Sequence, residues 1–355
     1  MKKSVLITGG AGFIGSNLAI KLKKKYSGYE IIVFDNLKRR GSELNLPRLK
    51  KHEIVFLHGD IRCKEDFEQI GPVNSIIDAS AEPSVLTGIE KDAEYLINTN
   101  LYGTINCLYF AQRHKADFIF LSTSRVYPIK LLNNVAFVET DNRFKYIEAQ
   151  IIKGVSENGV SEKFPLEGSR SLYGATKLAA EILIKEYNEL LNIKAVINRC
   201  GVIAGPWQMG KVDQGFVALW VAKHFWKQPL SYIGYGGLGK QVRDILHIDD
   251  LFKLIDYQLH NMNQINGDTF NIGGGLETSV SLKEMTKLCE EITGNKIKID
   301  NIPQTRIADL RIYYSDNTKA KEVMNWQPTF SSDKIITDAF NWIKENESSL
   351  KNIFN

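Results

Sequence analysis

Cysteine is scarce in this 355-residue sequence, and its four cysteines are widely scattered: Cys63, Cys107, Cys200 and Cys289. No two of them form a Cys-x-x-Cys pair, and no histidine stands at a spacing that would complete a zinc site. The sequence therefore excludes a disulfide-rich scaffold and predicts no metal site. We expect four reduced thiols, most of them buried.

Long apolar runs are missing as well. No segment approaches the ~20 consecutive apolar residues that a membrane-spanning helix requires. Near the N-terminus, the apolar run Val5-Leu6-Ile7 meets Thr8-Gly9-Gly10 too early to form the core of a signal peptide. We therefore expect a cytoplasmic protein without a membrane partner.

The chain has no large excess of charge of one sign. Its 45 Lys and Arg against 41 Asp and Glu give a net charge of +4, which is too balanced to predict a nucleic-acid partner. Two basic clusters, Lys23–Lys25 and Lys38–Arg40, lie within polar sequence and are interpreted as solvated surface. A hydrophobic fraction of 43% excludes disorder. At ~150 residues per domain, the length predicts about two domains.

Short β-branched runs alternate with longer segments of helical periodicity in the first two hundred residues. Strands are predicted over Ser4–Thr8, Ile31–Asp35, Ile54–Leu57, Ser75–Ala79, Phe118–Ser122 and Lys194–Arg199. Helices are predicted over Phe13–Tyr26, Asp92–Arg113 and Gly174–Leu191. This alternation predicts an α/β fold with a Rossmann-type, doubly wound parallel sheet over residues 1–200.

The alternation ends after Gly205-Pro206, and residues 201–355 are predicted to form mainly a smaller C-terminal lobe, interleaved with the first domain. Within the first domain, residues 128–168 are polar and have no clean period. An insertion of that length in a compact domain is usually functional or partly disordered.

A glycine-rich loop follows the first predicted strand and opens the first predicted helix. Gly10, Gly12 and Gly15 have the Gly-x-Gly-x-x-Gly spacing of dinucleotide-binding proteins. Such glycines permit a tight turn and a close approach of backbone N–H groups to a pyrophosphate, which the helix N-terminus also favours. The residues of this segment predicted to bind the cofactor are Gly9, Gly12, Phe13, Ile14 and Gly15.

An acidic residue stands at the distance that this motif requires. Asp35 ends the second strand, twenty positions after Gly15, where its carboxylate would bond the adenosine ribose and repel a 2′-phosphate. NAD is therefore predicted over NADP, although the neighbouring Lys38–Arg40 cluster raises the opposite possibility. Asn36, the next residue, is also predicted to bind the cofactor. Further on, Asp60 and Ile61 are predicted beside the adenine, and a helix N-cap is the structural alternative for Asp60.

Three residues are predicted to carry the chemistry. Tyr173 and Lys177 lie four apart at the start of a helix and so share one face. The ammonium group would favour the tyrosinate, which can take a hydroxyl proton while hydride leaves the same carbon. Thr123, at the end of the fifth strand, would bond the oxygen that alternates between alcohol and ketone. Tyr173 and Lys177 would also contact the nicotinamide ribose side of the cofactor.

These motifs together resemble the extended short-chain dehydrogenases/reductases that act on nucleotide sugars, and the resemblance covers nearly the whole chain. The matching segments include Gly9–Gly15, Asp35–Leu37, Gly59–Ile61, Asn98–Asn106, Thr123, Tyr173, Lys177, Arg243–Asp250, Phe270–Gly273 and Trp326–Pro328. The resemblance implies NAD as the cofactor and adds Ala79, Ser80, Ala81 and Asn100 to its site. It also implies a homodimer or homotetramer, with helices 92–113 and 174–191 pairing across a two-fold axis. The alternative is that the apolar residues of those helices only face the sheet.

The resemblance further implies a nucleotide-diphosphate sugar as substrate. Arg243 would grip its phosphates, with Gln214 and Arg311 as further substrate-binding residues. A salt bridge to Asp244 or Asp249 is the structural alternative for Arg243.

Within the family, several segments are more similar to the CDP-paratose 2-epimerases than to the 4-epimerases: Asp213–Val217, Gly239–His247 and Arg306–Arg311. Ser124 and Arg125 occupy the places where a 4,6-dehydratase needs an acid pair, and a decarboxylase usually has an acid at the second. Segment 201–206 departs from the family pattern, as do Ser80 and Glu82, which leaves the sugar open. The alternatives are a nucleotide-sugar 4-epimerase such as UDP-glucose 4-epimerase, a net oxidoreductase, or a non-catalytic Rossmann binding protein.

Overall fold

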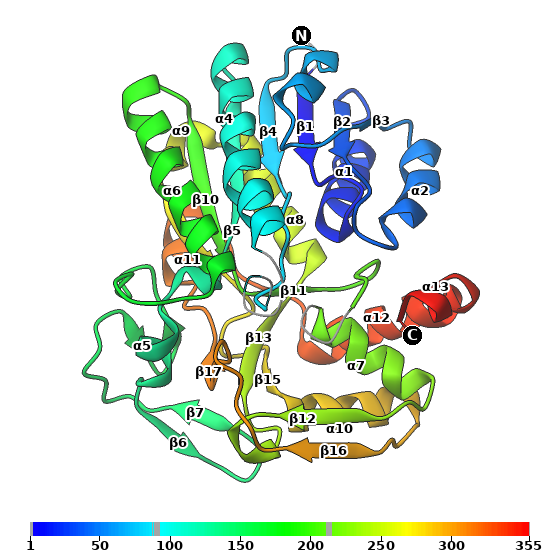
Figure 1. Cartoon of the computed structure of the whole chain (residues 1–355), viewed down its shortest axis with the longest axis vertical. Helices are drawn as coiled ribbons and strands as arrows, with labels where there is room; N and C mark the ends of the chain where they lie inside the picture. Colours follow the sequence, from blue (N-terminus) through cyan, green and yellow to red (C-terminus); the bar gives the residue numbers. More distant parts are fainter. Residues whose placement is uncertain (1–2, 87, 89–92, 211–214, 355) are drawn as a thin grey trace. The chain divides into compact units, whose positions relative to one another are not determined.

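Seven parallel strands form the main sheet of the computed structural model, which describes residues 3–86, 88, 93–210 and 215–354 (Figure 1). The sheet has the order β14-β10-β5-β4-β1-β2-β3. Its strands are β1 (Ser4–Thr8), β2 (Glu30–Asp35), β3 (Val55–His58), β4 (Ser75–Asp78), β5 (Asp117–Thr123), β10 (Ala195–Cys200) and β14 (Thr269–Ile272). The predicted doubly wound α/β class is confirmed.

The chain divides into two units, each built from discontinuous segments. Unit 1 comprises Met1–Thr123, Leu172–Arg199 and Phe252–Thr269, and unit 2 comprises Ser124–Ser171, Cys200–Leu251 and Phe270–Asn355. The helices that accompany the main sheet are α1 (Phe13–Lys25), α2 (Leu46–Lys51), α3 (Glu94–Ile97), α4 (Gly103–His114), α6 (Leu172–Leu191), α8 (Ile248–His260) and α9 (Met262–Ile265). Between α3 and α4 the chain makes a π-helical turn at Asn98–Tyr102, so one predicted helix is three elements.

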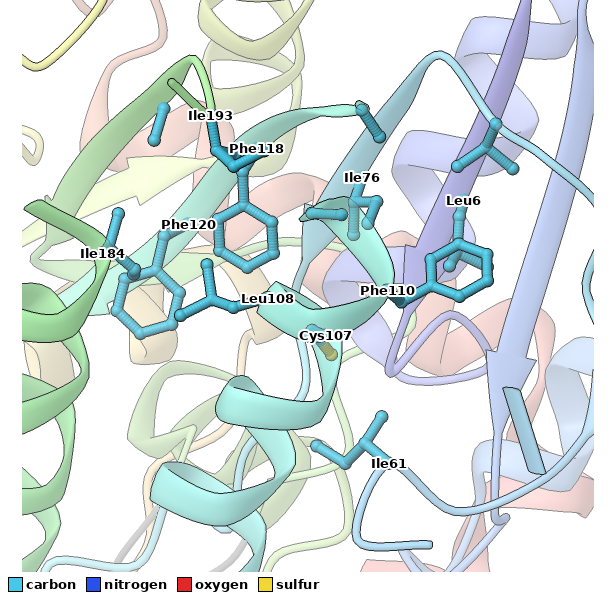
Figure 2. Packing of buried hydrophobic residues seen from close by; sticks show 14 of the residues in the cluster. Leu6, Ile61, Ile76, Cys107, Leu108, Phe110, Phe118, Phe120, Ile184 and Ile193 are labelled. Carbon is cyan, nitrogen blue, oxygen red and sulfur yellow. The ribbon is translucent and has the colours of Figure 1, made fainter. Parts of the chain in front are cut away.

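The core of unit 1 lies between the sheet and two helices, α4 and α6. Phe118 and Phe120 project from β5 toward Leu108 of α4, and Ile184 of α6 lies beside Phe120 (Figure 2). Side chains alternate between the faces of a strand, so residues 118, 120 and 122 face these helices together. The apolar runs that predicted the strands thus supply the buried surface on which α6 is seated.

Unit 2 contains smaller sheets. β11 (Val202–Ala204), β13 (Val242–His247), β15 (Ser279–Ser281) and β17 (Ile312–Tyr313) form a mixed sheet, and β12 (Leu230–Ile233) pairs with β16 (Ile299–Ile302). Its helices are α5 (Ile129–Asn133), α7 (Phe216–Phe225), α10 (Leu282–Thr293), α11 (Thr318–Met324), α12 (Ser332–Glu345) and α13 (Glu347–Phe354). A capping box begins α10, in which Ser281 accepts from the Glu284 N–H and Glu284 accepts from the Ser281 N–H.

The insertion 128–168 folds as two short hairpins after α5. β6 (Phe137–Glu139) pairs with β7 (Phe144–Tyr146), and β8 (Val155–Ser156) pairs with β9 (Gly159–Val160). The Tyr146 hydroxyl donates to the Ile312 carbonyl at 2.8 Å, which ties the first hairpin to β17. Strands of two or three residues are too short to show a periodicity, so these hairpins were not predictable from the sequence.

None of the described helices has the length and the apolar character that crossing a membrane would require.

Candidate active site

Several of the cofactor and catalytic residues predicted from sequence lie at one edge of the main sheet in unit 1. β1, β2, β4 and β5 run parallel, so their carboxyl ends meet at the same edge. The glycine loop, Asp35, the segment 79–81 and Thr123 follow or end these four strands. In open parallel sheets, this edge is where ligands bind.

The glycine loop has the geometry that a pyrophosphate requires. Gly9 adopts a φ of 61°, and the Gly12 N–H donates to its carbonyl at 3.1 Å to close the turn. A Cβ on Gly15 would lie 2.5 Å from Gly10 Cα, so the start of α1 packs directly on the loop. The first turn of α1 has no acidic residue and no side-chain cap. Its N–H groups can therefore face an anion, and the loop fits a dinucleotide.

Asp35 ties the end of β2 to this loop. Its carboxylate accepts hydrogen bonds from the Ala11 N–H at 3.0 Å and from the Leu37 N–H at 2.8 Å. Burial raises the pKa of Asp35, while these backbone donors act in the opposite direction. Because a carboxylate has about four acceptor sites, it can hold the loop and still accept from a ribose hydroxyl.

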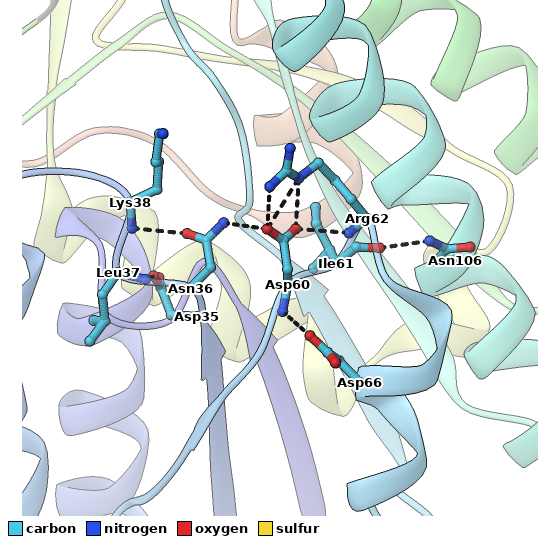
Figure 3. Close-up of polar contacts among 9 residues, drawn as sticks. All are labelled: Asp35, Asn36, Leu37, Lys38, Asp60, Ile61, Arg62, Asp66 and Asn106. Carbon is cyan, nitrogen blue, oxygen red and sulfur yellow. Dashed lines mark hydrogen bonds and ion pairs between the residues drawn. The ribbon is translucent and has the colours of Figure 1, made fainter.

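Asp60 is the centre of a second polar network (Figure 3). It accepts from Asn36 Nδ2 at 2.8 Å and from Arg62 Nη2 at 2.6 Å. Burial alone would raise the pKa of Asp60, but the hydrogen bonds from Arg62 and Asn36 lower it to about 2. Asp60 also accepts from the Arg62 N–H, and the next helical turn begins only at Lys64. Asp60 is therefore not the N-cap of that turn.

The surroundings of Asp60 extend to α3 and α4. The Arg62 guanidinium lies 4.6 Å from the ring centroid of Tyr95, and the ammonium group of Lys38 lies 5.4 Å from it. The Ile61 carbonyl accepts from Asn106 Nδ2 at 2.8 Å. Asn36, Asp60 and Ile61, all predicted to bind the cofactor, thus belong to one connected network.

Asp78 was not predicted as a site residue. It ends β4, is fully buried, and accepts from Thr8 Oγ1 at 2.8 Å, Thr104 Oγ1 at 3.0 Å and the Ser80 N–H at 3.1 Å. Thr8 and Asp78 are register partners in the sheet. The carboxylate therefore fixes the segment that holds the predicted cofactor residues Ala79, Ser80 and Ala81. An acid at the end of an apolar strand was the available signal.

Asn100 fixes the next part of this segment. Its Oδ1 accepts from the Glu82 N–H at 2.8 Å and its Nδ2 donates to the Glu82 carbonyl at 3.0 Å. The residue is fully buried within the π-helical turn. Such π-helical turns are frequent at functional sites.

Tyr173 and Lys177 lie on the first turns of α6, which packs against β5. Tyr173 is half-buried, whereas Lys177 is 1% exposed, and its ammonium group lies 4.0 Å from the ring centroid of Phe120. Thr123 is buried at the end of β5. The two elements thus carry a phenol, an ammonium group and a hydroxyl, the three groups required to move a hydroxyl proton.

Two of the predicted substrate residues lie in unit 2, and Gln214 lies outside the described residues. Arg243 donates to the Val242 and Leu310 carbonyls, each at 2.7 Å. Within the described residues it pairs with no carboxylate, so the salt-bridge alternative for Arg243 is wrong. The guanidinium carbon of Arg311 lies 4.2 Å from the ring centroid of Phe137 and 5.2 Å from that of Tyr235.

Across the ranges that the structure describes, no group of three or more His, Cys, Asp and Glu could hold a metal ion.

Asp35→Ala is expected to weaken NAD binding about tenfold or more, because a hydrogen bond to a charged group contributes ~1.5–3 kcal/mol. The same change removes the charge that repels a 2′-phosphate, so discrimination against NADP should fall. Titration of cofactor-depleted protein with each dinucleotide, followed by tryptophan fluorescence, measures the dissociation constants for NAD and NADP. Glu30→Ala, which removes an exposed carboxylate at the opposite end of the same strand, is the control and should leave both values near those of the parent. Unchanged affinity with unchanged preference would remove Asp35 from the site.

Comparison with known proteins places this geometry in a family. The model of the NAD dependent epimerase/dehydratase family matches residues 5–273. A CDP-paratose 2-epimerase of Salmonella typhi is 31% identical over 95% of this chain and 98% of its own. A putative UDP-glucose 4-epimerase of Methanocaldococcus jannaschii is 29% identical over 96% and 99%.

A solved structure has the same fold. The UDP-glucuronic acid 4-epimerase of Bacillus cereus, in complex with UDP-glucuronic acid and NAD, is 25% identical, with a TM-score of 0.77 over 96% of this chain and 99% of its own. The resemblance to the extended short-chain dehydrogenases/reductases and the prediction of NAD as the cofactor are thereby confirmed. The chain belongs to the NAD-dependent epimerase/dehydratase family and is an NAD-dependent enzyme of its nucleotide-sugar epimerases.

Proposed function

We propose that this enzyme inverts C2 of a CDP-linked deoxyhexose by transient oxidation to a keto sugar. The choice of C2 is carried by the CDP-paratose 2-epimerase that is 31% identical across nearly the full length of both chains. Arg125 supports it, because a basic residue two positions after Thr123 is typical of that group and excludes the acid pair of a dehydratase. Arg125 donates to the Ala308 carbonyl at 3.0 Å.

The chemistry is assigned to the three groups at the end of β5 and the start of α6. Tyr173 takes the proton of the C2 hydroxyl, and the buried Lys177 favours its ionised form. Thr123 bonds the same oxygen and orients it. NAD, when bound, accepts hydride from C2 and returns it to the opposite face. Tight retention of the cofactor is required, because its loss after oxidation would strand the ketone.

The cofactor contacts are assigned to residues that share the sheet edge or its polar networks. The glycine loop and the first turn of α1 hold the pyrophosphate, and Asp35 with Asn36 holds the adenosine ribose. Asp60 and Ile61 lie beside the adenine, and Lys177 reaches the nicotinamide ribose. Residues 79–81 and Asn100 line the remaining part.

The substrate diphosphate is assigned to Arg243 and Arg311, with Gln214 as a further contact. Two guanidinium groups match the charge and geometry of a diphosphate. Burial raises the pKa of Tyr235, while Arg243 and Arg311 both act to lower it, as expected of two cations that flank one phenol. Anchoring the nucleotide at this pair lets the keto sugar rotate and present its other face.

Self-association is assigned to the outer face of α4 and α6, together with the turn before α4. Four apolar residues there are each more than half exposed: Tyr102, Tyr109, Ile182 and Leu190. Such a patch on unit 1 fits a second copy of the chain better than water. We therefore propose a homodimer or a homotetramer.

Inversion at C4 is the second candidate, favoured by the 29% identity to a putative UDP-glucose 4-epimerase over a similar length. A CDP-linked deoxyhexose carrying deuterium at C2 separates the two. The proposed enzyme should give the inverted product with its label retained, because the hydride that leaves C2 returns to C2 within one complex. Mass spectrometry and NMR measure label and configuration.

Two other results would each contradict this outcome. Loss of deuterium to water would indicate deprotonation at carbon and refute hydride transfer. Turnover of UDP-glucose to its C4 epimer, with CDP-sugars untouched, would establish the 4-epimerase instead.

A further inference from the structure

A buried ion pair links α6 to the sheet at the next turns after Lys177. Glu181 is 1% exposed and Arg199, on β10, is 3% exposed. Arg199 Nη2 donates to Glu181 Oε2 at 2.7 Å, and its Nε lies 3.0 Å from the same oxygen. Ser122 Oγ, on β5, donates to Glu181 Oε1 at 2.5 Å. One carboxylate on the helix is thus held by two adjacent strands.

Both ends of this cluster adjoin the residues assigned to catalysis. Glu181 lies four residues after Lys177 and eight after Tyr173, so all three share a face of α6. Ser122 immediately precedes Thr123. The cluster therefore joins the helix that carries the phenol and the ammonium group to the strand that carries the hydroxyl.

Stability alone does not account for this arrangement. Replacing a buried ion pair by apolar residues of similar volume is often neutral or stabilising, because burial removes both charges from water. The pair instead fixes how α6 is oriented relative to β10, since the planar guanidinium and the carboxylate meet in a fixed geometry.

The charge pattern of α6 shows which register of the helix against β10 the ion pair selects. Lys177, Glu181 and Lys185 recur every four residues, and only Glu181 stands opposite Arg199. A slip of the helix by four residues, about 6 Å, would bring a lysine against Arg199 whichever way it moved. Two like charges in a buried interface are strongly unfavourable, so the pattern excludes both neighbouring registers.

We propose that Glu181 is a positioning residue, which through Arg199 and Ser122 sets the register of α6 and hence the placement of Tyr173 and Lys177 relative to Thr123. The inference rests on the catalytic roles proposed above for those three residues. A misplacement of about 1 Å in a catalytic group can lower the rate about a hundredfold. The pair would therefore act mainly on turnover, with only a small effect on the cofactor contact assigned to Lys177.

The test compares Glu181→Gln with a matched control, Gln258→Leu on α8, whose hydrogen-bond partner lies on the same strand as Arg199. Asn198, next to Arg199, shares a fully buried pair of reciprocal hydrogen bonds with Gln258 of α8, at 2.8 and 2.9 Å. Gln258→Leu thus breaks a buried polar pair at β10 without touching α6. Steady-state kcat, KM for the sugar nucleotide, bound NAD and Tm are measured for both variants.

Glu181→Gln should lower kcat about tenfold to a hundredfold with KM and bound NAD nearly unchanged, whereas Gln258→Leu should lower Tm but keep kcat. If Glu181→Gln does not fold, Arg199→Lys and Ser122→Ala replace it. Arg199→Lys keeps the charge without the two-pronged geometry, and kcat should still fall. Parental kcat in these variants, or equal losses in Glu181→Gln and Gln258→Leu, would overturn the proposal.

Tyr173→Phe distinguishes a failure of the positioning role of Glu181 from a failure of the catalytic roles assigned to Tyr173, Lys177 and Thr123. If it is inactive while Glu181→Gln behaves as Gln258→Leu does, the positioning role alone is refuted. If Tyr173→Phe keeps its turnover, the catalytic assignment fails, and the positioning role fails with it.

Discussion

Tyr173→Phe is expected to lower kcat by about 10²–10⁴-fold, the range typical of a lost general base. The ring keeps its place on α6, so the fold and the bound NAD should be retained, and only the group that exchanges the hydroxyl proton is lost. Steady-state assay of the purified variant, with its NAD content measured after denaturation, gives both quantities. Thr123→Val should cost less, because Thr123 orients the oxygen without taking its proton.

A tyrosine on the same helix offers the matched control. Tyr187 lies against Tyr109 at 6.5 Å between ring centroids, and within the described residues its hydroxyl makes no hydrogen bond. Tyr187→Phe is therefore the same chemical change away from the reacting groups, and it should keep full turnover. Near-parental activity of Tyr173→Phe, or an equal loss in Tyr187→Phe, would remove Tyr173 from the chemistry.

Gly15→Ala is expected to yield protein that is purified without NAD and has a lower Tm. The added methyl group would lie 2.5 Å from both Gly10 Cα and Gly9 O, which are backbone atoms that cannot move aside without displacing the loop. Alanine normally stabilises a helix interior by ~1 kcal/mol relative to glycine, so a loss of stability here runs against propensity. Ultraviolet absorbance of the denatured protein and a thermal melt report the two effects.

Gly12→Ala separates the loop's own packing from its contact with the cofactor. Gly12 has an extended backbone (φ −71°, ψ 178°) that alanine adopts readily, and the nearest atom to an added Cβ is Gly9 O at 3.1 Å. The Tm of this variant should therefore stay closer to the parent value than that of Gly15→Ala. The variant should still lose NAD, because glycine in this loop permits the close approach of the backbone to the pyrophosphate.

Gly28→Ala, with nothing within 4 Å of the added atom, is the neutral control. A full complement of NAD in Gly15→Ala would contradict the placement of the pyrophosphate.

Local signals explain why so much of unit 1 was predictable. The strand Ser4–Thr8 was predicted with its observed bounds, and the glycine loop follows it as expected, because apolar runs and glycine spacing are read within a dozen residues. The third strand was misplaced by one residue, beginning at Val55 and not at Ile54. Its side chains are partly exposed, so its apolar pattern is weaker.

Partnerships between distant segments were not predictable in the same way. In the sequence, Glu181 and Arg199 stand out as charged residues within apolar segments. Their pairing depends on β10 lying beside β5, which no local sequence pattern indicates. The same limit applies to Arg311. Its ring partners Phe137 and Tyr235 lie far away in the chain, and one of them belongs to an insertion without periodicity.

The order in which the chain supplies the strands of the main sheet has a consequence for synthesis on the ribosome. β10 is complete at Cys200, but its outer neighbour β14 begins only at Thr269. All six residues of β10 are buried in the finished protein. Until β14 has been translated, this strand forms an unpaired edge, which is the kind of surface through which nascent chains aggregate. The edge of the partly built sheet therefore stays unpaired for the time needed to translate about seventy residues, at roughly 5–20 residues per second.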